Sequence, residues 1–139
     1  MTKQRGFTLI ELLVVIAIIG VLSAVVLASL NTARSKGNDA AIKANLATIQ
    51  VQAEMYYDTH TNSYLGVCGD PVVAAAINSA RAANGGVSSC QSPAPGVAYA
   101  VSAGLSSNTS RYWCIDSTGN NTNSTTALAT GVTVCPASN

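Results

Sequence analysis

The chain has 139 residues, of which 48% are hydrophobic, and its net charge is +1. This length predicts one domain, but the apolar residues gather near the N-terminus while the remainder is rich in Ala, Ser, Thr, Asn and Gly. From Thr61 onward the charged residues are two arginines and two aspartates. This balance argues against a basic patch for nucleic acid in that part of the chain.

The N-terminal segment has the length and composition of a membrane-spanning helix. Leu12 to Leu30 form a run of 19 residues without a charge. As a helix this run rises about 28 Å, which matches a hydrocarbon core of about 30 Å. Lys3 and Arg5 precede the run and are expected to stay in the cytoplasm, so the C-terminal part of the chain is predicted to be exported.

The residues in front of the apolar run are not those of an ordinary secretory signal. The small residue Gly6 stands before the run and the bulky Phe7 opens it. A secretory signal has its small-residue cleavage site after the apolar core instead. An uncleaved signal anchor is a second interpretation of this order.

Glu11 places a carboxylate near the start of the predicted membrane helix. A charged side chain costs about 2.5 to 3.5 kcal/mol at the bilayer centre and somewhat less near an interface. The next cationic side chain along the helix is Arg34. Cleavage after Gly6 would free the α-amino group of Phe7, which could pair with Glu11 of a neighbouring chain. Such a pair would neutralise both groups and stagger adjacent helices along their axis.

Residues 5–15, with the sequence RGFTLIELLVV, resemble the class III signal of type IV pilins and type II secretion pseudopilins. The resemblance implies that a membrane-embedded prepilin peptidase cleaves between Gly6 and Phe7 and methylates the new amino group of Phe7. It also implies that Glu11 drives docking of each subunit into a growing filament. The implied partners are the peptidase, a membrane assembly platform, the lipid bilayer and further copies of the chain.

The chain is accordingly divided into four predicted parts. Residues 1–6 are the leader, 7–30 the transmembrane and polymerisation helix, 31–60 its amphipathic continuation, and 61–139 the exported head. In the continuation, apolar residues at spacings of three and four predict one covered face, formed by Ile42, Leu46, Ile49, Ala53 and Tyr56. The predicted location is the cytoplasmic membrane, crossed once with the N-terminus inside, and then an extracellular or periplasmic filament.

Four cysteines lie beyond the apolar segment, without the CxxC spacing of zinc or thiol redox sites. Disulfides in an oxidising compartment are therefore the preferred interpretation. Three pairings are possible, and we favour Cys68 with Cys90 and Cys114 with Cys135, because each closes a local loop around one recognisable unit. The second loop also resembles the disulfide-bounded C-terminal region of type IV pilins.

The head is predicted to contain one short helix and three strands. Asp70 and Pro71 are typical of a helix start, and Gly85 of a helix end. Alternating apolar residues predict strands at 96–103, 110–116 and 131–135. The expected fold class is α+β: a long N-terminal helix, membrane-spanning in its first half, packed on a small antiparallel sheet with two disulfides. This is the ladle-like architecture that the family resemblance implies.

Other chemistry finds less support in the residues. Asp116 begins an oxygen-rich turn roughly where the major type II pseudopilin binds calcium, but a single carboxylate favours a plain polar hairpin loop. His60 beside Asp58 lacks a nucleophile motif. The tyrosines and Trp113 lack the interleaved basic residues needed to stack on nucleic acid. We therefore expect no enzymatic activity, no cofactor and no resident metal.

The predicted function is that of a structural subunit of a type IV pilus-like filament, assembled by bundling of N-terminal helices after leader cleavage. A pseudopilin of a type II secretion or competence system is the first alternative, and a monomeric signal-anchored binding module is the second. A disulfide between Cys114 and Cys135 favours the pilin, and calcium at Asp116 favours the pseudopilin. Replacement of Glu11 by Ala separates both from the module, which would keep its location and fold.

Overall fold

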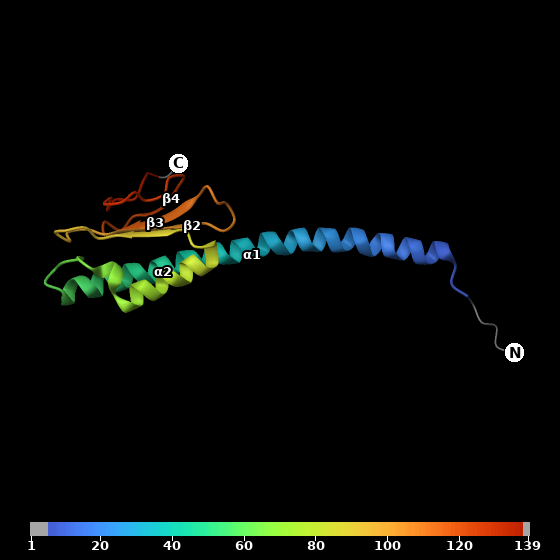
Figure 1. Ribbon diagram of the computed structural model, residues 1–139, viewed down its shortest axis with the longest axis horizontal. Coiled ribbons are helices and arrows are strands. Elements are labelled where there is room, and N and C mark those ends of the chain that lie inside the picture. Colours follow the sequence, from blue (N-terminus) through green and yellow to red (C-terminus); the bar gives the residue numbers. More distant parts are fainter. Residues whose placement is uncertain (1–5, 138–139) are drawn as a thin grey trace. The chain divides into compact units, whose positions relative to one another are not determined.

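The computed structural model describes residues 6–137, and its contacts divide the chain into two units that meet at Arg34 and Ser35 (Figure 1). The first unit holds the start of helix α1, which spans Leu9–Thr59. The second unit holds the rest of α1, a short 3-10 turn at Val67–Gly69, helix α2 at Pro71–Asn84 and a four-stranded sheet.

Helix α1 changes character along its length. Within the first unit every described side chain is exposed, because no other element of that unit packs against the helix. Within the second unit Ile42, Leu46, Ile49 and Ala53 are buried. Their spacing of four, three and four places them on one side of a helix with 3.6 residues per turn, which confirms four of the five residues of the predicted covered face. The fifth, Tyr56, is partly buried against the same core.

Helix α2 begins and ends at the predicted residues. The Asp70 carboxylate accepts hydrogen bonds from the backbone N–H groups of Val72 at 2.9 Å and Val73 at 3.1 Å, and Pro71 occupies the first helical position. At the other end Gly85 has a φ of +82° and donates its N–H to the Arg81 carbonyl. These are ordinary capping devices: an aspartate satisfies the free N–H groups, and glycine adopts the left-handed conformation without a steric cost.

The sheet is antiparallel, with its strands in chain order from one edge to the other. The strands are β1 at Ser88–Gln91, β2 at Ala100–Gly104, β3 at Tyr112–Asp116 and β4 at Asn121–Ser124. Alternate side chains point to opposite faces. Val101 and Ile115 pack in one cluster with α1 and α2, while Ala100 and Cys114 lie in a second cluster on the other face.

The predicted strand at 131–135 is wrong, and two strands were not predicted. The segment 131–135 forms no strand because three of its N–H groups bond outside the sheet. Gly131 donates to the Gln91 side chain at 2.9 Å, Val132 to the backbone carbonyl of Ala129 at 3.3 Å, and Cys135 to the Asp116 carboxylate at 2.8 Å. Strands β1 and β4 are polar and lack apolar alternation. They form because each pairs with a central strand. The predictions at 96–103 and 110–116 correspond to the shorter strands β2 and β3.

The second unit therefore has three layers. Helix α2 and the C-terminal part of α1 cover one face of the sheet, and the irregular segment 125–137 covers the other, where Leu128 and Cys135 pack on Ala100 and Cys114 (Figure 1). The long helix, the antiparallel sheet and two disulfides confirm the predicted α+β fold class.

Candidate functional site

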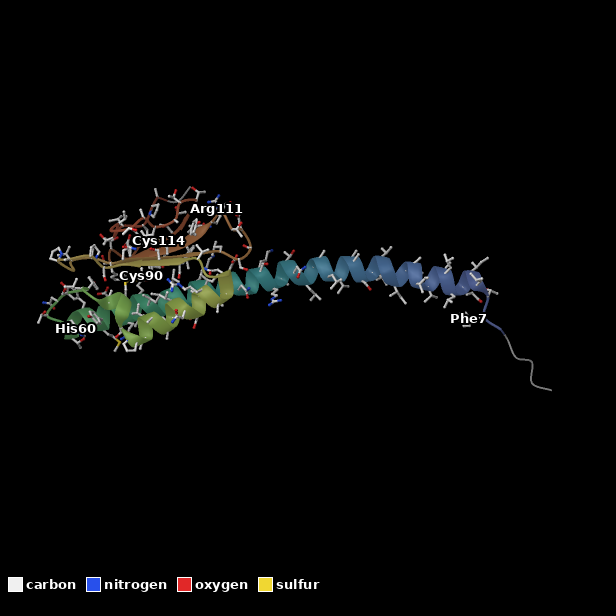
Figure 2. All side chains as sticks on the ribbon, in the orientation of Figure 1. Phe7, His60, Cys90, Arg111 and Cys114 are labelled. Atoms are coloured by element: carbon white, nitrogen blue, oxygen red, sulfur yellow. A yellow bond between two sulfur atoms is a disulfide. The ribbon has the colours of Figure 1, made fainter. Side chains whose placement is uncertain are left out.

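The predicted processing site lies at the start of the described chain. Gly6 and Phe7 precede α1, and the Phe7 side chain is 81% exposed and projects from the backbone (Figure 2). No atom lies within 4 Å of the position that a Cβ on Gly6 would take. The space beside the Gly6 Cα is therefore open among the described residues. Residues 1–5 of the predicted leader, including Lys3 and Arg5, lie outside the described residues.

Three hydrogen bonds, which run in both directions, join Glu11 and Thr8 at the start of α1. The Glu11 carboxylate accepts from the Thr8 backbone N–H at 2.8 Å and from the Thr8 hydroxyl at 2.8 Å. In return, the Thr8 hydroxyl oxygen accepts from the Glu11 N–H at 3.3 Å. This arrangement is a capping box, in which two N–H groups without a partner in the helix are satisfied by side chains.

Thr8 is the residue of this site that the sequence analysis missed. Its signal was present, because Thr8 and Glu11 stand three apart in front of an apolar run, which is the pattern of a capping box. Within residues 6–137 both donors to the Glu11 carboxylate belong to Thr8, and both are uncharged. The capping box thus gives the Glu11 carboxylate two hydrogen bonds but supplies no counter-ion among these residues.

The first unit also exposes a large apolar surface. From Leu9 to Leu30 all side chains are exposed within the chain, with Leu9 at 79% and Ile10 at 75%. Among the described residues, α1 is the one helix whose length and composition allow it to cross a membrane. Isolated apolar surface on this scale needs a cover of lipid or protein.

The cysteines pair sequentially. Cys68 joins Cys90, with Cα atoms 5.9 Å apart, and Cys114 joins Cys135, with Cα atoms 5.7 Å apart. The first disulfide links the 3-10 turn before α2 to strand β1, and the second links β3 to the C-terminal segment. Figure 2 marks Cys90 and Cys114, which contribute one cysteine from the sheet to each bridge. The disulfides therefore staple both coverings of the sheet.

Asp116 is fully buried and anchors the C-terminal segment. Its carboxylate accepts five hydrogen bonds, from the N–H and hydroxyl of Thr118, the N–H and side-chain amide of Asn120, and the N–H of Cys135. Burial by itself would raise the pKa of Asp116, but the bonds from Cys135, Thr118 and Asn120 outweigh it and lower the pKa below its ordinary value.

The same contacts argue against Asp116 as a calcium ligand. Both carboxylate oxygens are occupied by donors, with Oδ1 facing Thr118 and Asn120 and Oδ2 facing Asn120 and Cys135. Calcium takes six to eight oxygen ligands and favours several carboxylates. Among the described residues no group of three or more His, Cys, Asp or Glu side chains is placed to hold a metal. The arrangement is that of a structural turn.

His60 and the aromatic residues also have structural positions. The His60 ring stacks on Tyr56 at 3.8 Å, and its Nδ1 lies 3.0 Å from the Tyr56 carbonyl at the end of α1. Tyr64 lies between Tyr57 and Tyr99 in the core, with ring centroids 4.6 Å and 4.9 Å away. Burial, together with a hydrogen bond to Glu54, raises the pKa of Tyr64 to about 12. These rings are packed rather than presented for stacking.

Comparisons with known proteins identify the N-terminal segment. A family model described as the prokaryotic N-terminal methylation motif matches residues 1–27. The type IV wide pilus major component PilA4 of Thermus thermophilus is 47% identical over 64 residues, which are 46% of this chain and 48% of that protein. No solved structure matches the chain significantly.

Two secretion proteins are also similar to the chain. The type II secretion system core protein G of Klebsiella pneumoniae is 38% identical over 56 residues, or 40% of either chain. The protein of the same name from Dickeya chrysanthemi is 37% identical over 54 residues, which are 39% of this chain and 35% of that protein. The chain thus spans about half the length, or less, of these relatives.

These matches confirm the family resemblance inferred from residues 5–15. The motif match contains Gly6, Phe7, Thr8 and Glu11. The chain carries the N-terminal methylation motif of prepilins and is homologous, over part of its length, to the type IV pilin PilA4 and to type II secretion core protein G.

Proposed function

We propose that this chain is a structural subunit of a type IV pilus-like filament. The observation that carries the proposal is the match of residues 1–27 to the methylation motif, joined to a helix whose apolar side chains are all exposed in its first part, from Leu9 to Leu30. In this proposal a prepilin peptidase cleaves between Gly6 and Phe7 and methylates the Phe7 amine. The subunit then enters a filament at a membrane assembly platform.

Assembly in this proposal depends on an electrostatic pair between copies. The Phe7 amine of one subunit meets the Glu11 carboxylate of its neighbour inside the membrane, where both charges are costly when alone. Phe7 and Glu11 are four residues apart, so the pair displaces adjacent helices by about 6 Å along the axis. The capping box holds Glu11 in place and contributes hydrogen bonds before the amine arrives.

The proposed location follows from the same features. The chain crosses the cytoplasmic membrane once through the first part of α1, with its N-terminus in the cytoplasm. The second unit then lies outside the cytoplasm. Its two disulfides support this assignment, because disulfides persist in oxidising compartments.

A pseudopilin of a type II secretion or competence system is the second candidate. The similarity to core protein G at 38% identity favours it, and the N-terminal mechanism would be the same. Three features weigh toward the pilus: the higher identity to PilA4, the disulfide from Cys114 to Cys135, and the hydrogen bonds that both oxygens of the Asp116 carboxylate accept. Thermal unfolding with and without calcium separates the two candidates, since only the pseudopilin interpretation expects calcium to raise the stability of the second unit.

Substitution of Glu11 tests the proposal. Filaments sheared from cells are measured against the amount of subunit in the membrane. Glu11→Ala and the isosteric Glu11→Gln are both expected to abolish filaments while the membrane level stays unchanged, and Glu11→Asp is expected to retain part of the yield. Val51→Gln, an exposed change elsewhere on α1, serves as the matched control. Normal filaments with Glu11→Gln would contradict the proposed charge pair.

Mass analysis of the mature N-terminus tests the processing step. The expected product begins at a methylated Phe7, and Gly6→Val is expected to leave the precursor uncut because a branched side chain beside the 6–7 bond hinders the peptidase. Mature protein that still begins at Met1 would support the signal-anchored module instead.

A further inference from the structure

The corner between α2 and strand β1 contains Asn84 and Gly85, the one place in the sequence where an asparagine precedes a glycine. Asn84 is the last residue of α2, and Gly85 follows it with a φ of +82°. An asparagine side chain can react with the next backbone nitrogen of its own chain, and glycine hinders that nitrogen least because it has no Cβ. The sequence therefore places a reactive amide beside an unhindered nucleophile.

Four hydrogen bonds hold the Asn84 side chain in the folded corner. Its Nδ2 donates to the Val87 carbonyl at 2.6 Å and to the Gly104 carbonyl at 2.9 Å. Its Oδ1 accepts from the N–H groups of Gly86 and Val87, both at 3.0 Å. Because both ends of the amide are bonded, the side chain links the end of α2 to strand β2 and is fixed in one orientation.

The nitrogen of Gly85 is engaged as well. Its N–H donates to the Arg81 carbonyl and caps α2. An N–H group at the end of a helix points back along the axis toward a carbonyl of the preceding turn, and not toward the side chain of the residue before it. The folded corner therefore keeps both reacting groups in other bonds.

We propose that Asn84 is a self-modification site that is closed while this corner is folded and reactive once the corner opens. In the open chain the Gly85 nitrogen loses its proton to hydroxide and attacks Cγ of Asn84. The new N–C bond closes a succinimide ring, and Nδ2 takes a proton from water and leaves as ammonia. Water then opens the ring at either carbonyl, which gives aspartate or isoaspartate. Overall one water is consumed and one ammonia is released.

The modified residue does not rebuild the corner. The donor to Val87 and Gly104 is lost, and a carboxylate would face these two carbonyl oxygens. Acceptors that lose their donor and meet a negative charge favour the open corner. Isoaspartate also adds one carbon to the backbone between α2 and Gly85. The modification therefore marks, irreversibly, a chain whose second unit has opened.

The Cys68–Cys90 disulfide protects the corner more directly than the other disulfide does. Cys90 lies on β1, the strand that leaves the corner (Figure 2). Cys114–Cys135 instead joins β3 to the segment that covers the other face of the sheet. Loss of Cys68–Cys90 is thus expected to open the corner more often, because local opening depends on the contacts nearest to it. Formation of this disulfide closes the modification site.

Mass analysis of peptides that contain residue 84 measures the conversion. Full-length protein in detergent is incubated at mildly alkaline pH, either folded or unfolded in urea. We expect conversion to be at least tenfold slower in the folded protein. In urea, Gly85→Ala should lower the rate at least fivefold, because its methyl group crowds the attacking nitrogen. Equal rates in folded and unfolded protein would overturn the gate, and an unchanged rate in Gly85→Ala would overturn the succinimide route.

The disulfide variants locate the gate. Without urea, Cys68→Ala/Cys90→Ala is expected to convert at least threefold faster than Cys114→Ala/Cys135→Ala, which has lost a disulfide of similar loop length. Equal acceleration in both variants would show that global unfolding exposes Asn84, and it would overturn the assignment of the gate to this corner.

Asn84→Asp, made directly, tests whether the modified corner stays open. The Gly104 N–H donates to the Val87 carbonyl at 3.0 Å, and its hydrogen exchange is expected to be at least fivefold faster than in the unmodified chain. Asn78→Asp makes the same change at an exposed residue of α2 and should exchange like the unmodified chain. Full protection of the Gly104 N–H in Asn84→Asp would overturn the irreversible mark.

Discussion

Single residues in the second unit position segments of irregular backbone. Asp116 is the clearest case, because one buried carboxylate collects N–H groups from its own turn and from Cys135, 19 residues away. Gly96 is another, because segment 63–65 passes directly over it and Tyr64 donates its N–H to the Gly96 carbonyl at 2.8 Å. In both cases a specific contact with a residue far away in the sequence fixes backbone that has no regular secondary structure.

The lowered pKa of Asp116 predicts a stability that depends on acid. In the unfolded chain the pKa of an aspartate is about 3.9. Because the pKa is lower in the folded unit, ionised Asp116 contributes stability above about pH 4, and this contribution is lost as pH falls toward the folded pKa. Asp116→Asn is expected to lower the free energy of unfolding by about 1 to 3 kcal/mol at pH 7 and to flatten this acid dependence.

Urea unfolding of the full-length chain in detergent, followed at pH 7 and at pH 3, measures both effects. Asp58→Asn is the matched control, because Asp58 is exposed and has no hydrogen-bond partner among residues 6–137. An acid dependence that is equally steep in Asp116→Asn would contradict the assignment.

Gly96→Ala is predicted to be strongly destabilising. Gly96 has a φ of +84°, and a Cβ there would lie 2.6 Å from the Leu65 nitrogen. Gly119→Ala is the control, since Gly119 has a φ of +86° but no neighbouring atom within 4 Å of its Cβ position. The left-handed conformation alone costs about 1 to 2 kcal/mol. Thermal unfolding should therefore show Gly96→Ala less stable than the control by at least about 1 kcal/mol, and equal stability would exclude the clash.

The helices of the chain are stabilised by caps at their ends, and the sheet is linked to its coverings by disulfides. Helix α1 starts with a capping box at Thr8 and Glu11, and α2 starts at Asp70 and ends at Gly85. The disulfides bind the two coverings of the sheet: Cys68–Cys90 secures the side of α2, and Cys114–Cys135 secures the C-terminal segment. Because the second unit is small, these local devices carry a large share of its stability.

Thr8→Ala is predicted to loosen the first turn of α1. Loss of a threonine cap costs about 1 kcal/mol, which corresponds to roughly fivefold faster opening of the N–H group of Glu11. Hydrogen exchange of the full-length chain in detergent measures this rate. Thr8→Ser keeps the hydroxyl and should exchange like the unmodified chain. Unchanged protection of Glu11 in Thr8→Ala would show that the capping box is not formed in solution.

The disulfides are predicted to differ in what they protect. They close loops of similar length, with sequence separations of 22 and 21, so removal of either should cost about 3 kcal/mol. Only Cys114→Ala/Cys135→Ala should release segment 125–137. Limited proteolysis followed by mass analysis should then find early cuts in this segment. The comparison variant, Cys68→Ala/Cys90→Ala, should show no early cuts there. Early cuts in 125–137 in the comparison variant would contradict the proposed division of roles.

At the scale of the whole molecule, the two units have opposite relations to solvent. The first unit exposes all of its described apolar side chains, and the second buries a core in which α1, α2 and the sheet meet. A surface such as that of the first unit is not stable in water without a partner. The chain is therefore suited to two environments, lipid or neighbouring helices for one unit and water for the other.

This contrast predicts the behaviour of purified full-length protein. It should be a monomer in detergent and should associate when the detergent is removed, because Leu9, Ile10 and the following side chains then face water. Size-exclusion chromatography with light scattering measures the change. A stable monomer in plain buffer would mean that the apolar helix finds cover within its own chain.

The sequence alone determined what depends on neighbours along the chain: the membrane-length apolar run, the methylation motif, the covered face of α1 and both ends of α2. The tertiary structure decided which segments form strands, because this depends on residues that are distant in the sequence. Strands β1 and β4 exist because they pair with central strands, and 131–135 is not a strand because the N–H groups at its two ends bond to the side chains of Gln91 and Asp116. Local patterns contain the first kind of information, whereas the second requires hydrogen-bond partners that only folding brings together.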